Sequence, residues 1–180
     1  MIFLETERLF LRNYKETDFS DVMKYFSSEE VSKFEDFYPM SEVQVKRIIT
    51  EWKEMDNRLV AELKSSHTVI GSIGYWTDDE GHHCIDYDFN PDYGGMGYAT
   101  EAGKKLIQYL FETLGVSGVY GDCDVRNEAS WKLMERLGLS RMQKLDNQSY
   151  KKDKNNKPIM ISTYLYGLEK NDYETQEELQ

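Results

Sequence analysis

The segment from Cys84 to Leu114 constrains the fold of this chain more than any other part of the sequence. Apolar and polar residues alternate up to Phe89, which predicts a β-strand, and a cluster of glycines then interrupts the pattern. Beyond the glycines, apolar residues recur every three or four positions, as they do on one face of a helix: Ala99, Ala102, Gly103, Leu106, Ile107, Leu110 and Leu114. A strand, a tight turn and a long amphipathic helix in direct succession predict a domain in which helices pack on a sheet.

The same change of period divides the rest of the chain into strands and helices. Strands are predicted at residues 5–12, 58–63, 69–76, 84–89, 116–125, 139–145 and 159–168, and helices after Thr17, from Ser41 to Met55, at 99–114 and at 127–137. The links between neighbouring strands are short, and short links favour antiparallel pairing. The sequence therefore predicts an α+β fold, with a mixed, mostly antiparallel central sheet of about seven strands and helices on both faces.

The composition suits one globular domain. Of the 180 residues, 39% are hydrophobic, and no repeat or linker interrupts the chain. We expect residues 1–170 to form a single domain and residues 171–180 to be a polar C-terminal tail that frays.

No secretory signal is visible at the start of the sequence, and no apolar run is long enough to cross a membrane. The two cysteines, Cys84 and Cys123, are too few for a disulfide scaffold. These features predict a cytoplasmic protein with no membrane partner.

The formal net charge of −11 bears on the partners that the protein accepts. A strongly acidic chain repels the phosphate backbone of nucleic acids, so we expect no nucleic-acid partner. The charge suits a cationic substrate, although acidity that only maintains solubility is the favoured explanation.

The glycine-rich turn after Phe89 has the features of an anion-binding loop. Glycines allow positive φ angles and a close approach of the backbone to a ligand. The first N–H groups of the following helix have no partner within the helix, and the helix dipole is positive at that end. These properties suit a pyrophosphate, but the glycine count alone leaves a purely structural turn equally open.

Four segments resemble the GNAT superfamily of N-acetyltransferases, and in particular the branch that includes the ribosomal-protein N-terminal acetyltransferases. The resemblance covers nearly the whole chain, and the matching segments occur in the order that the family requires. They are residues 94–102, similar to the acetyl-CoA signature; residues 6–12, similar to the opening strand; residues 70–75, similar to the third strand; and residues 125–139, similar to the second cofactor motif.

The resemblance implies an acetyl-CoA-dependent N-acetyltransferase whose acceptor is an amine-bearing small molecule or peptide. It allows a homodimer and implies no metal. The cofactor-binding residues that it implies are Gly94, Gly95, Met96, Gly97, Tyr98, Ala99 and Thr100 for the pyrophosphate, Tyr87, Asp88 and Phe89 for the pantetheine, and Asn127 and Ser130 for the pantetheine arm and the sulfur. From the residues alone, Asn127 is equally well explained as a helix N-cap, and Ser130 as an ordinary residue of a first helical turn.

The chain departs from the family pattern at two positions. Gly94 stands where the signature usually has Gln or Arg, so one polar side chain is lost while the backbone donors remain. Met134 stands where many members have a tyrosine that protonates the leaving thiolate, and methionine cannot donate a proton. Ser130 is then the more natural candidate for the general acid.

Direct transfer to an amine requires a polarised carbonyl and a proton acceptor. The backbone N–H near Phe89 is the candidate for the first task, and Asp88 joins Ser130 and Phe89 in the predicted catalytic set. The residues do not single out one base, because carboxylates alternate along two predicted strands: Asp86 and Asp88 on one, and Asp122 and Asp124 on the other.

Other interpretations fit parts of the sequence. A dinucleotide-binding oxidoreductase would use the Gly-x-Gly-x-x-Thr run that begins at Gly95, but threonine replaces a small residue, and an antiparallel meander precedes the motif. A GNAT fold that binds CoA without catalysis also remains open. A calcium loop from Asp86 lacks the required glycine and glutamate, and the neighbouring His82, His83 and Cys84 lack the spacing of metal ligands.

The acceptor itself is not identified by the sequence, because a fold does not fix its substrate. Three aromatic residues, Phe34, Phe37 and Tyr38, lie in the early region that commonly covers the acceptor side in this family. They are candidates for lining that pocket, and a core or surface role is equally open.

Overall fold

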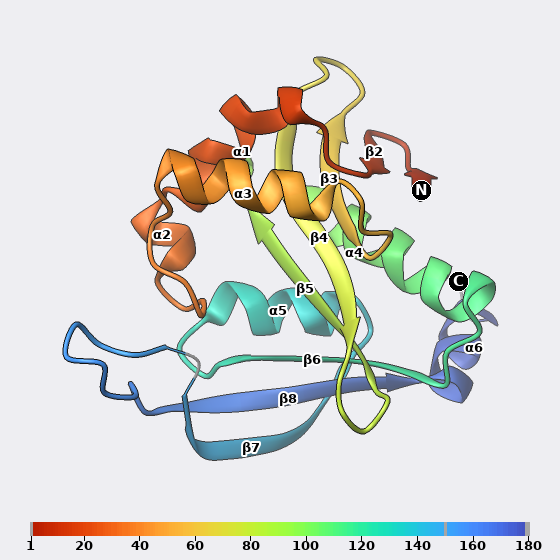
Figure 1. Cartoon of the computed structure of the whole chain (residues 1–180). Helices are drawn as coiled ribbons and strands as arrows, with labels where there is room; N and C mark the ends of the chain where they lie inside the picture. Colours follow the sequence, from red (N-terminus) through yellow and green to blue (C-terminus); the bar gives the residue numbers. More distant parts are fainter. Residues whose placement is uncertain (1, 150, 179–180) are drawn as a thin grey trace. The chain divides into compact units, whose positions relative to one another are not determined.

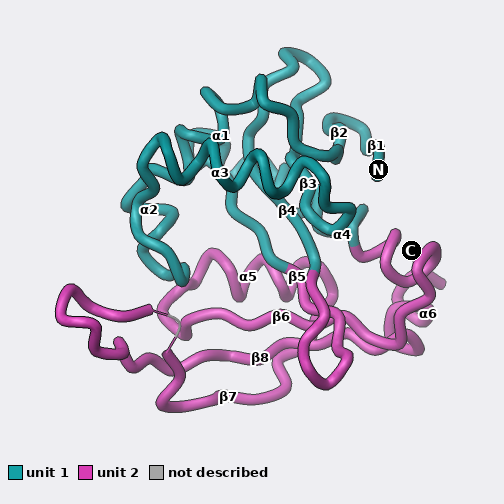
Figure 2. The backbone as a smooth tube through the Cα atoms, in the orientation of Figure 1, with its two compact units in different colours: residues 1–75, 86–106 teal, residues 76–85, 107–180 magenta. Residues whose placement is uncertain are grey.

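The computed structural model describes residues 2–149 and 151–178. The chain divides into two compact units, one of residues 1–75 and 86–106 and the other of residues 76–85 and 107–180 (Figure 2). Strand β5 (His83–Phe89) and helix α4 (Tyr98–Gln108) each run from one unit into the other. That residues 1–170 act as a single domain stays a prediction.

The described part of the first unit contains β1 (Phe3–Glu5), β2 (Leu9–Arg12), β3 (Arg58–Leu63), most of β4 (Val69–Thr77) and the C-terminal part of β5. The single strand predicted at residues 5–12 is wrong, because a turn divides it into two antiparallel strands that pair Glu5 with Phe10. Thr6 closes this turn: its backbone N–H donates to the Leu9 carbonyl at 3.0 Å, and its hydroxyl accepts from the Leu9 N–H at 2.9 Å.

Helices of the first unit pack beside these strands. A 3₁₀ turn (η1, Glu16–Asp18) leads into α1 (Phe19–Phe26), and α2 (Glu29–Ser32) and α3 (Glu42–Trp52) follow. The helix predicted from Ser41 begins with a capping box, in which the Ser41 hydroxyl and the Gln44 side chain each bond the other's backbone N–H. Helices α1 and α3 lie side by side (Figure 1), and they share a buried core with the strands: Tyr14, Val22, Tyr25, Phe26, Val45, Ile49, Val60 and Val69.

A buried ion cluster joins β2 to η1 and β3. The Arg12 guanidinium donates to both carboxylate oxygens of Asp18, at 2.8 and 2.9 Å, and its Nε donates to Glu62 at 2.5 Å. The three residues are at most 9% exposed. Both carboxylates therefore have a partner in the interior, and Glu62 also bonds the His67 ring at 2.7 Å, although the two carboxylates outnumber the single guanidinium.

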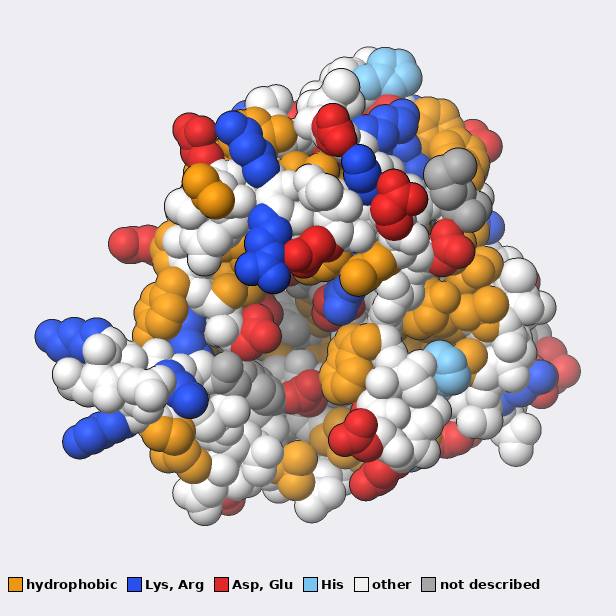
Figure 3. All heavy atoms as spheres, in the orientation of Figure 1, with side chains coloured by type: hydrophobic (Ala, Val, Ile, Leu, Met, Phe, Trp, Pro, Cys, Tyr) orange, Lys and Arg blue, Asp and Glu red, His pale blue; other side chains and the backbone are white. Residues whose placement is uncertain are grey.

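The second unit is built on the long antiparallel pairing of β6 (Gly118–Asp124) with β8 (Ile161–Glu169), which in turn pairs with β7 (Ser140–Gln148). Helix α5 (Glu128–Arg136) follows β6, and a five-residue π-helix, η3 (Tyr109–Thr113), continues α4. The lysine-rich loop between β7 and β8 projects from the sheet (Figure 1), and its lysines form a cluster of basic side chains on the surface (Figure 3).

The expectation of a frayed tail is wrong for residues 171–178. They belong to helix α6 (Lys170–Glu178), which has one large aromatic anchor. The Tyr173 ring stacks on Phe111 with centroids 4.5 Å apart, and its hydroxyl donates to Glu112 at 3.0 Å. This burial offsets the polar composition that predicted disorder.

The order of hydrogen-bonded strands is β1-β2-β3-β4-β5-β6-β8-β7. The predicted α+β fold with a mixed, mostly antiparallel sheet is confirmed, with eight strands because the first predicted strand is two. Strands β5 and β6 pair in parallel through His83 with Val119 and Cys84 with Tyr120, both at the N-terminal end of β5.

Candidate active site

The predicted anion loop directly follows β5. The Asn90 backbone N–H donates to the Ile70 carbonyl at 2.9 Å, and its side chain caps the short 3₁₀ turn η2 (Pro91–Tyr93) by accepting from the Asp92 N–H at 3.1 Å. Residues 94–97 follow this turn, and α4 then begins at Tyr98. The loop is thereby fixed at both ends, by a strand and by a helix.

The glycines of this loop leave the backbone open. Gly95 and Gly97 have φ angles of +72° and +82°, which side-chain-bearing residues rarely adopt. A Cβ atom on Gly95 would meet nothing within 4 Å, and one on Gly97 would meet only a guanidinium nitrogen of Arg8 at 3.4 Å. Open space over positive-φ glycines at a helix N-terminus fits a pyrophosphate, which needs close approach to backbone N–H groups.

Arg8 contacts this loop, although the sequence did not identify it as a site residue. Its Nε donates to Glu101 at 2.6 Å and its Nη1 to the Met96 carbonyl at 2.9 Å, while the guanidinium lies 4.3 Å from the centre of the Tyr98 ring. The side chain is 41% exposed. Its guanidinium lies beside the loop, where the Glu101 carboxylate shares its charge, and only its place in the 6–12 motif hinted at a role.

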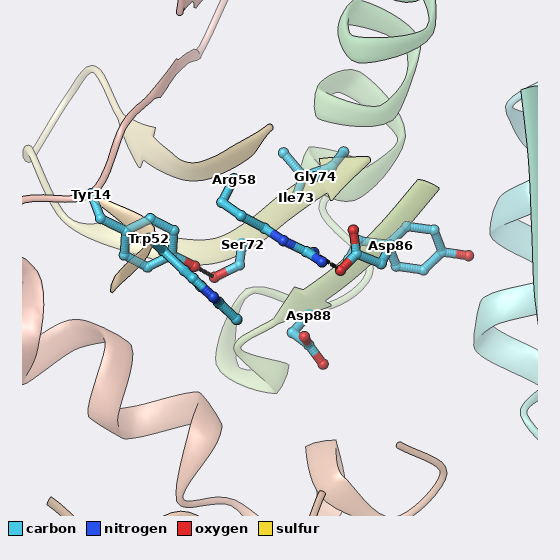
Figure 4. A pocket seen from close by; sticks show the side chains of 9 residues that line it. Tyr14, Trp52, Arg58, Ser72, Ile73, Gly74, Asp86 and Asp88 are labelled. Carbon is cyan, nitrogen blue, oxygen red and sulfur yellow. Dashed lines mark hydrogen bonds and ion pairs between the residues drawn. The ribbon is translucent and has the colours of Figure 1, made fainter. Parts of the chain in front are cut away.

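A second feature is a pocket floored by β4 and β5. It is small, with about 10 Å³ of space for the centre of a water-sized molecule, and its lining residues are Tyr14, Trp52, Arg58, Ser72, Ile73, Gly74, Asp86, Tyr87 and Asp88 (Figure 4). All of these residues belong to the first unit. The pocket therefore uses the strand that leads into the glycine loop.

The two carboxylates of the pocket differ in their partners. Asp86 forms an ion pair with Arg58, whereas Asp88 stands apart from that pair in Figure 4. The Oδ1 atom of Asp88 is buried and has no hydrogen-bond partner among the described residues. Burial, together with the negative charges of Glu35, Asp86 and Asp36, raises the pKa of Asp88 well above its usual range.

The deep side of the pocket is a hydroxyl network. The Ser72 hydroxyl bonds the hydroxyl of Tyr14 and, at 2.6 Å, the hydroxyl of Tyr25. Burial raises the pKa of both tyrosines, so both stay neutral. This network fixes the Tyr14 ring, whose edge meets Trp52 at a centroid distance of 5.5 Å.

The predicted residues of the second unit gather at the start of α5. Asn127 caps this helix by accepting from the Ser130 N–H at 3.2 Å, so the structural explanation of Asn127 holds. The Ser130 hydroxyl bonds the buried Cys123 thiol, whose pKa burial raises to about 11 while Ser130 acts in the opposite direction. Met134 is 1% exposed and packs near Gly121, which is a core position.

Of the four candidate bases, the two on β6 are less suited to the role. Asp124 is buried and binds the Arg126 guanidinium and backbone N–H, which lowers its pKa. Asp122 lies exposed on the strand. Asp88 is the candidate whose carboxylate lines a pocket and forms no ion pair with a described cation.

The three aromatic residues considered for the acceptor side do not line this pocket. Phe37 packs edge-on against Phe26 at 5.4 Å, Phe34 lies beneath the Lys33 ammonium, and Tyr38 is 54% exposed. The aromatic residues that line the pocket besides Tyr87 are instead Tyr14 and Trp52, which lie outside the segment 34–38.

The histidine and cysteine neighbours at the start of β5 have structural partners. The His82 ring bonds Asp78 at 3.0 Å and lies 4.9 Å from the Tyr120 ring. Within residues 2–149 and 151–178, no group of three or more His, Cys, Asp or Glu side chains is arranged to hold a metal ion.

Comparison with known proteins agrees with this geometry. Residues 8–140 match the family model described as an acetyltransferase (GNAT) domain. An uncharacterized N-acetyltransferase p20 of Bacillus licheniformis is 30% identical over 178 residues, which cover 94% of this chain and 97% of that protein. The chain belongs to the GNAT family, and it is an acetyl-CoA-dependent acetyltransferase.

Solved structures show the same fold at lower identity. A GNAT-family acetyltransferase from Bacillus anthracis superposes with a TM-score of 0.86 at 22% identity, over 94% of this chain and 99% of that one. A ribosomal-protein-S5-alanine acetyltransferase from Vibrio fischeri gives 0.72 at 20% identity, over 96% and 99%. These structures show the shared fold, and the family match does not favour an oxidoreductase.

Proposed function

We propose that the protein transfers the acetyl group of acetyl-CoA directly to a primary amine of a cationic small molecule or peptide. The observation that carries this proposal is the Asp88 carboxylate, which lies in a pocket on β5 without a neutralising partner. Such a carboxylate attracts an ammonium group and can then accept its proton. Family membership supports the acetyl transfer, and the pocket supports the cationic acceptor.

The cofactor residues proposed from the family motif fit the loop that follows β5. The backbone N–H groups of residues 94–100 would hold the pyrophosphate, with the Arg8 guanidinium contributing positive charge. The backbone of Tyr87, Asp88 and Phe89 would hold the pantetheine, because β5 pairs with β6 only near its N-terminal end among the described register pairs. Acetyl-CoA supplies a thioester whose carbon accepts the amine nitrogen and whose sulfur leaves with a proton.

The chain's own residues then manage two protons. Asp88 takes one from the incoming ammonium, which leaves the amine lone pair free to attack. The Phe89 N–H would polarise the carbonyl, and the Ser130 hydroxyl, held by the Cys123 thiol, is the proposed donor to the sulfur. Ser130 would regain its proton from the second proton that the acetylated nitrogen loses, so that one proton ends on Asp88 and the other on the thiol. Titration of the protein with acetyl-CoA, and with NADH as the control, tests the cofactor; release of free thiol with an added amine tests the transfer.

Replacing Gly97 by valine is expected to weaken acetyl-CoA binding by about tenfold or more, because a branched side chain would occupy the open space over the loop. Calorimetric titration measures the loss. Gly81→Val is the matched control, since Gly81 also has a positive φ of +89° and open space around it, but lies in the turn before β5. Equal affinity in the Gly97 and Gly81 variants would show that the assigned loop does not hold the cofactor.

Replacing Ser130 by alanine is expected to lower kcat by about tenfold and to leave acetyl-CoA affinity nearly unchanged. This is less than the roughly hundredfold loss typical of a general acid, because a thiolate is already a fair leaving group. Thiol release at saturating substrates measures the effect, and Ser117→Ala on the surface is the control. Full turnover in the Ser130 variant would remove this residue from the mechanism.

We also infer a cytoplasmic protein without a nucleic-acid partner, and we keep the homodimer as a proposal. The support is the net charge of −11 and the two free cysteines, Cys84 and Cys123. Within the described part of the chain, no helix is both long and apolar enough to cross a bilayer.

A further inference from the structure

The peptide bond between Met96 and Gly97, in the middle of the glycine loop, has its carbonyl held by a side chain from a distant turn. The Arg8 Nη1 atom donates to the Met96 carbonyl oxygen at 2.9 Å. The described residues contain no cis peptide bond, and in a trans peptide the C=O and the N–H point in opposite directions. The contact with Arg8 therefore fixes the direction of the Gly97 N–H, which points away from the guanidinium.

The next peptide of the loop is fixed from the other side, by helix α4. The Glu101 backbone N–H donates to the Gly97 carbonyl at 3.0 Å. The Tyr98 N–H belongs to the same peptide as this carbonyl, so it points out of the N-terminal end of the helix. Both carbonyls that flank the Gly97 Cα atom are thus occupied, and the N–H of each of these peptides faces away from its occupied carbonyl.

The Glu101 side chain holds Arg8 in the position that this arrangement needs. Its carboxylate accepts from the Arg8 Nε at 2.6 Å, from the Arg8 backbone N–H at 2.8 Å and from the Thr6 hydroxyl at 2.6 Å. Burial acts to raise the pKa of Glu101, but the hydrogen bonds from Thr6 and Arg8 lower it, so the carboxylate is ionised at neutral pH. Glu101 therefore acts on both carbonyls, on one through its backbone and on the other through Arg8.

These contacts need an arginine and not simply a cation. A guanidinium is planar and carries its donors at fixed angles, so it can bond a carboxylate and a carbonyl at the same time. Arg8 does this while its guanidinium lies 4.3 Å from the centre of the Tyr98 ring. The pair of Arg8 and Glu101 is formally neutral, so its larger effect on a bound anion comes from the peptide that it orients.

We propose that Arg8 and Glu101 are positioning residues for the cofactor, and that they direct the Gly97 N–H to the pyrophosphate of acetyl-CoA. This inference rests on the proposed function, in which residues 94–100 hold the pyrophosphate. The pair acts through the peptide between Met96 and Gly97 and not as a free charge. The loop then depends for its anion affinity on a residue 88 positions earlier in the chain.

Calorimetric titration with acetyl-CoA tests Glu101 by the sign of the change. Glu101→Gln removes a negative charge beside the loop, so it would tighten the binding of an anion if Arg8 acted as a charge. We expect binding to weaken by about fivefold or more, because glutamine keeps one acceptor oxygen for three donors and releases the Arg8 side chain. Urea unfolding of the variant verifies that it is folded.

Arg8→Lys is the second variant, because it keeps the charge but not the paired contacts of the guanidinium. Its affinity for acetyl-CoA is expected to fall by about tenfold, the order of one hydrogen bond to a charged group. Its affinity for S-acetylpantetheine, which has the thioester but no phosphate, is expected to stay the same. Arg47→Lys is the matched control, since Arg47 pairs with Glu51 on the exposed side of α3, and it is expected to bind both compounds normally.

Three results would overturn the positioning role. Tighter binding in Glu101→Gln, or full affinity in Arg8→Lys, would show that the guanidinium acts as a charge or not at all. An equal loss of affinity for acetyl-CoA and for S-acetylpantetheine would indicate general damage to the site. Each of these results leaves the proposed function standing if Gly97→Val still weakens acetyl-CoA binding. Absence of acetyl-CoA binding by the unmodified protein would overturn both.

Discussion

Replacing Asp88 by asparagine is expected to lower kcat/KM for the amine by about a hundredfold or more, the loss typical of removing a general base. The same change is expected to stabilise the protein at neutral pH by about 1 kcal/mol, because it removes a charge whose buried Oδ1 atom has no partner. A variant that loses activity while gaining stability is the signature of a strained functional group. Thiol-release kinetics and urea unfolding measure the two effects.

The pH dependence gives this prediction a sign that can be checked. The pKa of Asp88 is raised in the folded protein, by burial first and by Glu35, Asp86 and Asp36 next, so the folded state holds this proton more tightly than the unfolded chain. The stability that follows is full below the ordinary aspartate pKa and is lost as pH rises through the raised value. In Asp88→Asn this part of the decline is expected to disappear.

The control for this variant is Asp79→Asn, which removes the same charge from an exposed position. It is expected to keep both the activity and the pH dependence of unfolding. If Asp88→Asn unfolds at a lower urea concentration than the unmodified protein, the carboxylate is satisfied in solution and the basis of the proposed base fails.

Replacing Arg12 by methionine is expected to destabilise the protein by about 3–5 kcal/mol, the largest loss of stability predicted for this chain. Methionine keeps much of the side-chain volume but leaves the carboxylates of Asp18 and Glu62 buried without their shared cation. Urea unfolding at neutral pH measures the effect. Burial acts to raise the pKa of Glu62, but the hydrogen bonds from His67 and Arg12 lower it in the folded protein, so the unmodified protein loses this stabilisation as pH falls through the lowered value. The difference between the two proteins is therefore expected to shrink at acid pH.

Arg47→Met is the matched control for this prediction. Arg47 makes one ion pair with Glu51 at 2.7 Å, but on the exposed side of α3. Because solvent screens such pairs, this variant is expected to unfold at the same urea concentration as the unmodified protein. Equal stability of the Arg12 and Arg47 variants would mean that the buried cluster relaxes or admits water.

The parts of the site that could be predicted from the sequence are those set by local interactions. The cap at Asn127 and the capping box at Ser41 need only a few consecutive residues, and the glycine loop needs only its own backbone angles. These features follow from side-chain hydrogen bonding and from positive φ, which residue type reports directly.

The pocket could not be predicted in this way, because its lining depends on contacts distant in the sequence. Trp52 ends α3 and Tyr14 follows β2, yet the two rings meet, and Arg58 reaches across from β3 to Asp86 on β5. The alternation of Asp86 and Asp88 predicts that both lie on the same side of a strand, but it does not predict that they have different partners. That difference depends on which of them a distant cation reaches.

The parts of the molecule around the pocket differ in how readily they can accept substitutions. Its floor is made by adjacent strands whose packing is tight: a Cβ atom on Gly71 would come within 2.6 Å of the Phe89 ring. Glu35 and Asp36, in contrast, lie on a connection that forms no part of the sheet. This connection can therefore accept substitutions without disturbing the strand packing that holds Asp88 in place.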